Sequence, residues 1–415
     1  QTESDNEVAL HLVDRCGPDS LDRLNGMFAF VLAGSGGRFL AARDPVGIKP
    51  LYWARRGGSV RFASEMAAFD EDWRPDVEVF PPGHYWTPQR GLVQFAAAVP
   101  PDGWTADADP GSPDEVRRRT RDVLVDSVER QMMGDVPVGV FLSGGLDSSL
   151  VAAIAQRYLA ERGERLKTFA VGLCDSADLL AARAVAEYLG TEHHESVYTA
   201  SEAVAAVPDV VRAIEAFDPS LVRSAVPNHM LARFTSRHVK VVLTGEGADE
   251  LFAGYEYLCE FDDAESLQAE LVRSVEGLHN LNLQRCDRVT MAFGLEARVP
   301  FLDREVIEHA LRLPASWKLA SNGRPEKWLL REAFSGWLPE EFLWRGKSQF
   351  GDGSGAASVL TDTVSATVTE EELLAERDEV DPPLRTREEL AYYRIFKEHL
   401  SGVRPEATLG RFATA

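Results

Sequence analysis

The chain contains 415 residues, with 44 Lys and Arg against 66 Asp and Glu, and its formal net charge is -22. This length allows two or three domains, each with its own core, while the negative charge disfavours nucleic acid as a partner because it repels phosphate. The sequence has no run approaching the roughly 20 apolar residues that cross a membrane, and it opens on a polar, acidic segment unlike a secretory signal, so we expect a cytoplasmic protein with no membrane partner.

The region before residue 100 has the pattern of a β-rich domain. Short apolar segments such as MFAFVLAG, RFLAARD and VRFAS alternate with Gly-Gly turns, which is typical of antiparallel strands. We therefore predict an antiparallel, all-β or α+β domain over residues 1–99. Residues 100–114 are rich in Pro, Gly and Asp and poor in periodic apolar positions, so they are predicted to be a linker.

Residues 115–415 show a different pattern, in which apolar strands alternate with amphipathic helices. The predicted strands are 136–142, 166–173, 194–199 and 239–245. The predicted helices are 115–132, 148–160, 178–190 and 201–215, followed by mostly helical structure from 251 to 400. Strands and helices that alternate at short intervals favour a parallel sheet covered by helices on both faces. This domain is therefore predicted to have an α/β fold.

The segment VGVFLSGGLDSSL, residues 138–150, joins a predicted strand to a predicted helix through two adjacent glycines. Glycines let the backbone approach a ligand, and the free N–H groups at the helix start favour an anion, together with the hydroxyls of Ser143 and Ser148. We interpret the segment as a phosphate-binding loop. Because Asp147 would lie beside a polyphosphate, a divalent cation, Mg²⁺, is expected between them. The alternative is a Gly-rich turn capped by Asp and Ser, as in many α/β proteins.

A second acidic cluster, TGEGADELFAG at residues 244–254, comes at the end of the next predicted strand. Loops at the carboxyl ends of parallel strands can share one crevice, so Asp249 is predicted to complete a metal site with Asp147. Glu246 lies between glycines with little steric cover, which suits a general base or a substrate-facing carboxylate. Glu250 either supports the site or is a solvated acid at a helix start.

A site for phosphoryl chemistry also needs cations where negative charge develops. Arg298, in MAFGLEARVPFLDRE, and Lys347, in WRGKSQF, are isolated basic residues in apolar or turn-like segments. Lys347 is the first candidate, and a surface or ion-pair role is the alternative for either residue.

Several motifs occur in the order found in asparagine synthetases, and the resemblance extends over essentially the whole chain. They are SGGLDSS, FAVGL, LTGEGADELFAGY, GLEARVPFLD, PEKWLLRE and WRGKSQF, preceded by LNGMFAF, RDPVGIKPLYW and FASEM, which resemble the second half of the glutaminase domain of that family. For residues 115–415 the resemblance implies an α/β, parallel, doubly wound sheet of the ATP-pyrophosphatase type with a helical C-terminal part. For residues 1–99 it implies part of an antiparallel α+β glutamine amidotransferase type-2 domain of the N-terminal-nucleophile type.

Matching the family motifs position by position implies roles for individual residues. Glu246 matches the carboxylate that helps to form and resolve the acyl adenylate, and Lys347 matches a catalytic-loop lysine. Arg223, in FDPSLVRSAVP, is the implied partner of the substrate carboxylate, and Asp5 matches the last glutamine contact. The positions implied to contact ATP or pyrophosphate are Phe141, Leu142, Ser143, Gly144, Gly145, Asp147, Ser148, Val171, Thr244 and Gly245.

The sequence departs from the family pattern at three places. Thr244 stands where Ser is usual and keeps the hydroxyl, and the chain reads RSAVP where other members have the hydroxyl-rich RASTP. The N-terminal cysteine that serves as the glutaminase nucleophile does not occur, because the chain opens at Gln1. We expect the first part of this domain to lie outside the sequence, and loss of glutaminase activity is the alternative.

The implied function is that of an ATP-dependent amide synthetase that forms AMP and pyrophosphate. The leading hypothesis is conversion of aspartate to asparagine through a β-aspartyl adenylate, using ATP, Mg²⁺ and ammonia from glutamine, in a homodimer. The alternative is a relative that amidates or cyclises another carboxylate in secondary metabolism, such as a β-lactam synthetase, although those enzymes have tyrosine where this chain has Glu246. A catalytically idle nucleotide-binding homologue is disfavoured, because Asp147, Asp249 and Lys347 all occur in this sequence.

Overall fold

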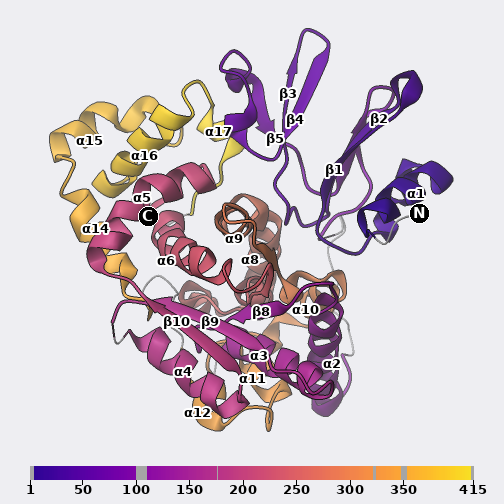
Figure 1. The fold of residues 1–415 in the computed structure, drawn as a ribbon, viewed down its shortest axis with the longest axis vertical. Coiled ribbons are helices and arrows are strands. Elements are labelled where there is room, and N and C mark those ends of the chain that lie inside the picture. Colours follow the sequence, from indigo (N-terminus) through magenta and orange to yellow (C-terminus); the bar gives the residue numbers. More distant parts are fainter. Residues whose placement is uncertain (1–3, 100–109, 175, 321–323, 347–352, 413–415) are drawn as a thin grey trace.

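The computed structural model describes residues 4–99, 110–174, 176–320, 324–346 and 353–412 (Figure 1). Its N-terminal part contains helix α1 (Asn6–Cys16) and two antiparallel sheets, with strand orders β1-β2-β6-β7 and β4-β3-β5. The strands are β1 (Ala29–Ala33), β2 (Phe39–Arg43), β3 (Tyr52–Arg56), β4 (Ser59–Ala63), β5 (Val77–Val79), β6 (His84–Thr87) and β7 (Gly91–Gln94). The predicted antiparallel α+β architecture is confirmed.

Aromatic side chains join the two N-terminal sheets. The ring of Phe62 in β4 lies 5.6 Å from that of Trp86 in β6 and 5.9 Å from that of Phe80, measured between centroids. Alternation along β4 and β6 directs the rings of Phe62 and Trp86 toward the apolar cluster that contains Phe80. The two sheets therefore share an apolar layer.

The C-terminal part is built on a parallel sheet of five strands in the order β10-β9-β8-β11-β12. The strands are β8 (Val138–Phe141), β9 (Lys167–Gly172), β10 (Glu192–Val197), β11 (Val241–Leu243) and β12 (Glu296–Arg298). All four residues of β8 and all three of β11 are buried, as expected for central strands covered on both faces. The predicted α/β class is confirmed.

Helices cover both faces of this sheet. Figure 1 shows α3 and α4 on one side, and α5, α6 and α9 on the other. The helices up to α9 are α2 (Pro113–Gln131), α3 (Leu146–Ala160), α4 (Ala177–Leu189), α5 (Ala200–Ile214), α6 (Pro219–Thr235), α7 (Ala248–Phe252), α8 (Ala264–Gly277) and α9 (Asn282–Met291). Those that follow are α10 (Arg304–Arg312), α11 (Trp328–Ala333), α12 (Glu340–Leu343), α14 (Ala356–Ser365), α15 (Glu370–Glu376), α16 (Arg387–His399) and α17 (Pro405–Thr408). The helical character predicted after residue 251 is confirmed.

The observed elements differ from the predicted bounds mainly at loops. The predicted strand at 239–245 is shortened to β11, because the chain leaves the sheet after Leu243 to form the second acidic loop. Helix α2 begins at Pro113, within the predicted linker, because Ser112 and Glu115 form a reciprocal capping box. Residues 100–109 of the predicted linker lie outside the described residues.

A buried carboxylate connects the N-terminal part to the C-terminal part. Glu215 accepts hydrogen bonds from the backbone N–H groups of Met66 (2.7 Å) and Ala67 (2.8 Å) and pairs with Arg288 at 3.0 Å. Glu215 has a φ of 49°, which is unusual for a residue with a side chain. Glu215 in the C-terminal part thus binds the backbone of the N-terminal part at Met66 and Ala67, while Arg288 neutralises its charge.

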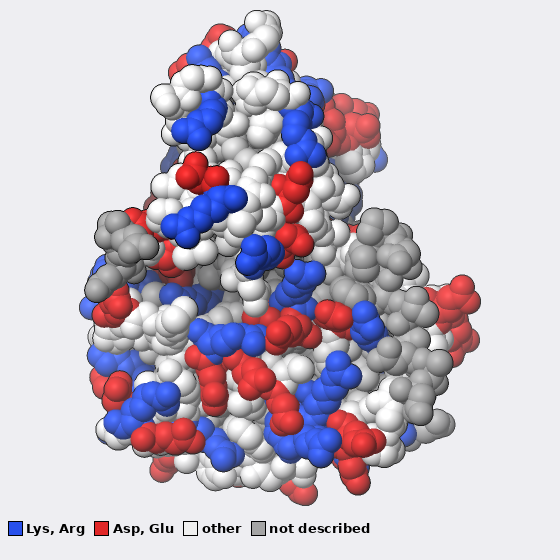
Figure 2. Space-filling model, turned by 90° about the vertical axis from the view of Figure 1, so that its right-hand side faces the viewer, with Lys and Arg blue, Asp and Glu red and all other residues white. Residues whose placement is uncertain are grey.

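Charged side chains of both signs are interspersed on the face shown in Figure 2. The negative net charge is therefore not gathered into one acidic patch on that face. In the described part of the chain, no helix combines the length and apolar character needed to cross a membrane.

Burial of Lys318 is expected to make the stability of the fold depend on pH. Its side chain is 3% exposed, its Nζ has no hydrogen-bond partner within the described residues, and burial lowers its pKa to about 7. An unfolded lysine has a pKa near 10.4. Between pH 7 and about 10, Lys318 is protonated in the unfolded chain but neutral in the folded chain. The free energy of unfolding therefore decreases as the pH drops through this range. Below pH 7 the full destabilisation by Lys318 is present.

Replacing Lys318 with methionine is therefore expected to stabilise the protein at pH 7, by about 2–4 kcal/mol. Urea unfolding at pH 7 and pH 9 measures the effect, and the gain should shrink at the higher pH. An equal change in unfolding free energy at both pH values would contradict the expectation.

Candidate active site

The predicted phosphate loop, residues 143–148, follows β8 and extends into the first turn of α3. The hydroxyls of Ser143 and Ser148 are 3.1 Å apart, the Ser143 backbone N–H points to the Ser148 hydroxyl at 3.3 Å, and the Gly145 N–H points to the Ser143 hydroxyl at 3.3 Å. Small donors thus cluster at the N-terminal end of a 15-residue helix. That end attracts anions, because its first N–H groups lack partners within the helix.

Two glycines allow the loops of the site to approach closely. Gly144 has a φ of 73°, and a Cβ there would lie 2.5 Å from the carbonyl carbon of Ala181. A Cβ on Gly245 would lie 2.8 Å from the Cβ of Asp147. The acidic loop after β11 therefore packs directly against the phosphate loop, as the parallel-sheet argument predicted.

Lys327 joins the two predicted metal-ligand carboxylates. Its Nζ lies 2.6 Å from Asp147 Oδ2 and 2.6 Å from Asp249 Oδ1, and its side chain is 3% exposed. Burial lowers the pKa of Lys327, but the two carboxylates outweigh burial and hold it above the ordinary value for lysine. Gly254 makes room for this contact, since a Cβ there would lie 2.1 Å from Cε of Lys327. Lys327 also has a φ of 54°, a strained conformation of the kind that concentrates at functional sites.

Lys327 was not singled out from the sequence, although it lies within the PEKWLLRE motif. The lysine chosen instead, Lys347, lies outside the described residues. Arg298, the other cation considered, donates to the carbonyl oxygens of Gln131 (2.6 Å) and Met133 (2.5 Å) and therefore secures the end of α2.

Asp147 and Asp249 form a donor set that suits Mg²⁺. Their oxygens converge on one point beside the phosphate loop, where Lys327 now contacts both. Mg²⁺ is usually held by one or two carboxylates together with substrate phosphates and water. Within the described residues, no group of three or more His, Cys, Asp or Glu could hold a metal alone. The residues therefore fit a cation that binds together with a polyphosphate.

Glu246 is paired with a buried arginine. Arg285 Nη2 donates to Glu246 Oε1 at 2.5 Å, and the Arg285 side chain is 7% exposed. Burial lowers the pKa of Arg285, but the neighbouring Glu246 raises it above the usual value. This partner was not predicted, because Arg285 lies in α9, a segment without a recognised motif. Glu250, by contrast, is buried and accepts a hydrogen bond from Tyr255 at 2.5 Å, so its interpretation as a solvated acid is wrong.

Arg345, which is distant in the sequence, contacts the phosphate loop. Its Nη1 donates to the Gly144 carbonyl oxygen at 3.0 Å, and its Nη2 lies 3.6 Å from Asp178. Burial raises the pKa of Asp178 to about 6, and Arg345 opposes that shift. Arg345 belongs to residues 344–346, the described start of the WRGKSQF segment, so this contact brings that part of the motif to the site.

These residues surround a cavity of about 450 Å³. Arg223 lines it and also donates from Nε to Glu388 Oε1 at 3.1 Å. Glu246 and Asp249 line it too, and so do all predicted ATP or pyrophosphate positions except Gly144, namely Phe141, Leu142, Ser143, Gly145, Asp147, Ser148, Val171, Thr244 and Gly245. Asp5 lies just before α1 and is not among the lining residues, so its role as a glutamine contact stays a prediction.

The site lies at the carboxyl edge of a parallel sheet. It contains a helix start with paired hydroxyls, two acidic loops and a lysine. These features define an α/β protein equipped to bind a polyphosphate. Comparison with known families identifies it further. The asparagine synthase family model matches residues 119–261 and 259–405, and a glutamine amidotransferase domain model matches residues 1–71. The chain belongs to the asparagine synthase family.

Curated proteins similar to this chain are named asparagine synthetases in different organisms. Asparagine synthetase [glutamine-hydrolyzing] 3 of Arabidopsis thaliana is 39% identical over 96% of this chain and 71% of its own length. A probable asparagine synthetase [glutamine-hydrolyzing] of Dictyostelium discoideum is 37% identical over 99% of this chain and 79% of its own length. Asparagine synthetase [glutamine-hydrolyzing] 2 of Arabidopsis thaliana is 40% identical over 99% and 73%, respectively.

Proposed function

We propose that the protein is a carbon–nitrogen ligase that uses ATP to convert aspartate to asparagine, with glutamine as the nitrogen donor. The observation that carries the proposal is that the phosphate loop, Lys327 and the Glu246–Arg285 pair all line one cavity. Membership of the asparagine synthase family supports the same reaction. The alternative acyl substrates are not favoured, because the similar curated proteins described above are named as asparagine synthetases.

The first step activates the β-carboxylate of aspartate. One of its oxygens attacks the α-phosphorus of ATP, the bond to the bridging oxygen breaks, and pyrophosphate leaves with the electron pair. The Ser143 and Ser148 hydroxyls and the N–H groups at the start of α3 bind the departing phosphates. The ammonium of Lys327 lies where negative charge accumulates, which favours the transition state over the bound ATP.

The second step forms the amide from the β-aspartyl adenylate. Ammonia attacks the acyl carbon, the carbon–oxygen bond to AMP breaks, and the nitrogen loses a proton. Glu246 is the carboxylate available for that proton, and Arg285 fixes its orientation through the 2.5 Å contact. Holding the adenylate and the nucleophile in one cavity also replaces an encounter in solution by a positioned reaction.

The cofactor and the assembly are part of the proposal. Asp147 and Asp249 would hold Mg²⁺, which would neutralise phosphate charge when bound. The amidotransferase match over residues 1–71 supports glutamine as the source of ammonia. A homodimer and a cytoplasmic location are expected from the family resemblance.

The test measures pyrophosphate release from Mg-ATP with and without aspartate, using ammonium or glutamine as donor, and detects asparagine. We expect aspartate-dependent release and asparagine formation with ammonium. Asp147→Ala is the matched variant, and it should abolish release because it removes a metal ligand and a partner of Lys327. Full activity in Asp147→Ala would contradict the site, and absence of aspartate dependence in the unaltered chain would contradict the substrate.

A further inference from the structure

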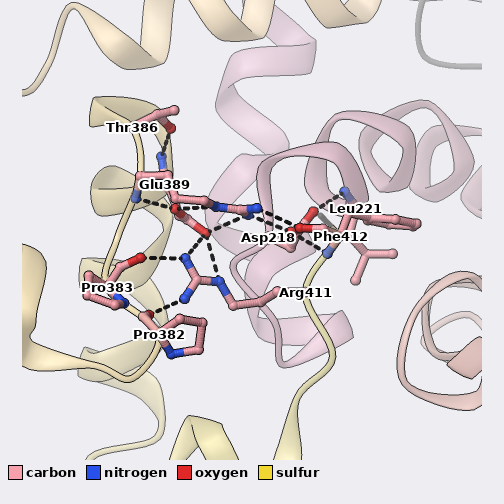
Figure 3. Close-up of polar contacts among 9 residues, drawn as sticks. Asp218, Leu221, Pro382, Pro383, Thr386, Glu389, Arg411 and Phe412 are labelled. Carbon is pink, nitrogen blue, oxygen red and sulfur yellow. Dashed lines mark hydrogen bonds and ion pairs between the residues drawn. The ribbon is translucent and has the colours of Figure 1, made fainter. Parts of the chain in front are cut away.

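The C-terminal segment, residues 409–412, folds back onto the start of α6. The Phe412 backbone N–H donates to Asp218 Oδ2 at 3.0 Å (Figure 3). Arg385 donates to the Phe412 carbonyl oxygen at 2.5 Å. Asp218 is also the N-cap of α6, since its Oδ1 accepts from the Leu221 N–H at 3.1 Å. The segment and the first turn of α6 therefore share one buried carboxylate.

Arg411 fixes the segment to α16. It donates to Glu389 Oε1 from Nε (3.0 Å) and from Nη2 (2.6 Å), and to the carbonyl oxygens of Pro382 and Pro383 (Figure 3). Glu389 has a fully buried side chain and pairs with Arg385 as well, at 3.0 Å. Two buried acids are thus matched by two guanidiniums, and such a network is costly to leave half-formed. The position of the segment is consequently well defined.

The same turn of α16 holds the candidate substrate-binding arginine. Glu388, next to Glu389 in the chain, accepts from Arg223 Nε at 3.1 Å and from the Tyr392 hydroxyl at 2.9 Å. Consecutive acids of α16 therefore secure Arg223 on α6 and Arg411 in the C-terminal segment. A shift of the segment would disturb both Asp218 and the turn of α16 that orients Arg223.

The segment also reaches the main cavity. Arg411 and Phe412 line it together with Ser220 and Arg223 of α6. Phe412 is partly buried and packs against the central hydrophobic core. The guanidinium of Arg411 donates to Glu389 and two carbonyl oxygens, whereas Phe412 is an apolar residue among those that line the cavity.

We propose that the C-terminal segment determines how the acyl substrate is held, with Phe412 as a wall of its binding site and Arg411 as a positioning residue that acts through Glu389. This inference rests on the proposed function. Displacement of Phe412 would alter the wall of the cavity that Arg223 also lines. The segment should therefore affect recognition of aspartate much more than recognition of ATP, whose phosphates bind at the start of α3.

The test compares Arg411→Ala and Phe412→Ala with the unaltered chain, using pyrophosphate release to obtain kcat and the KM values for aspartate and ATP. We expect the KM for aspartate to rise by about tenfold or more, in line with the loss of a pocket contact, with the KM for ATP changed less than about twofold. Phe412→Leu retains apolar bulk and should restore most of the affinity. Arg394→Ala is the control, because it removes ion pairs to Glu372 and Glu376 that do not line the cavity.

Unchanged KM values for aspartate, or equal rises for both substrates, would overturn the inference while the proposed function stands. An unaltered chain without aspartate-dependent release would overturn both. A second measurement covers variants that fail to fold. Hydrogen exchange of the Leu221 and Phe412 amides in the unaltered protein should slow when aspartate and an ATP analogue bind. Unaffected exchange at these amides, with protection at the phosphate loop, would also overturn the inference.

Discussion

Lys327→Met is expected to reduce aspartate-dependent pyrophosphate release by about 10²- to 10³-fold, the range found when one preorganised stabilising group is removed from an active site. The Lys327 ammonium lies 2.6 Å from both Asp147 and Asp249 and faces the cavity that contains the phosphate loop. Its loss leaves two carboxylates facing each other and removes the positive charge near the departing pyrophosphate. Initial rates of pyrophosphate release measure the effect.

The same substitution should also reduce stability. Two acids of like charge would remain close together without their cation, and because both are partly exposed we expect a loss of about 1–3 kcal/mol. Thermal unfolding measures this loss and shows whether the variant is folded under assay conditions. Lys397→Met is the matched control, since Lys397 forms an exposed ion pair with Glu379. Pyrophosphate release by folded Lys327→Met at the rate of this control would contradict the role of Lys327.

Glu246→Gln is expected to separate the two half-reactions. The amide has nearly the shape of the carboxylate and still accepts a hydrogen bond from Arg285, but it cannot take a proton from the attacking nitrogen. Asparagine formation should therefore fall by about 10²- to 10⁴-fold, the usual contribution of a positioned acid or base. Aspartate-dependent exchange of labelled pyrophosphate into ATP, which reports adenylation alone, should change by less than about tenfold.

Glu250→Gln is the control for that experiment. Burial first, and then the charge of Asp249, raise the pKa of Glu250, so the protonated acid that glutamine imitates is favoured there. A glutamine carbonyl can still accept from Tyr255 and Asn282. We expect both half-reactions to survive in Glu250→Gln. Equal losses of exchange and synthesis in Glu246→Gln would place Glu246 in adenylation instead of proton transfer.

The sequence by itself determined the fold class and the position of the glycine-rich turn between β8 and α3. Apolar strands alternating with amphipathic helices predicted the parallel sheet, and the adjacent glycines 144 and 145 located the strand-to-helix turn. The acidic loop could be assigned to the same crevice, because the carboxyl ends of neighbouring parallel strands must meet at one edge. These inferences depend only on local periodicity, on glycine conformation and on a general rule of sheet topology.

Only the tertiary structure decided which distant side chains complete the site. Lys327 lies 180 positions after its partner Asp147, and Arg345 lies 201 positions after Gly144. Arg285, in a helix without a recognised motif, is the partner of Glu246. Arg411, in the C-terminal segment, lines the same cavity. Contacts of this kind depend on how helices pack over the sheet and on which buried charges must be neutralised. Local patterns predict the elements, whereas the pairing of distant charges follows from burial in a common core.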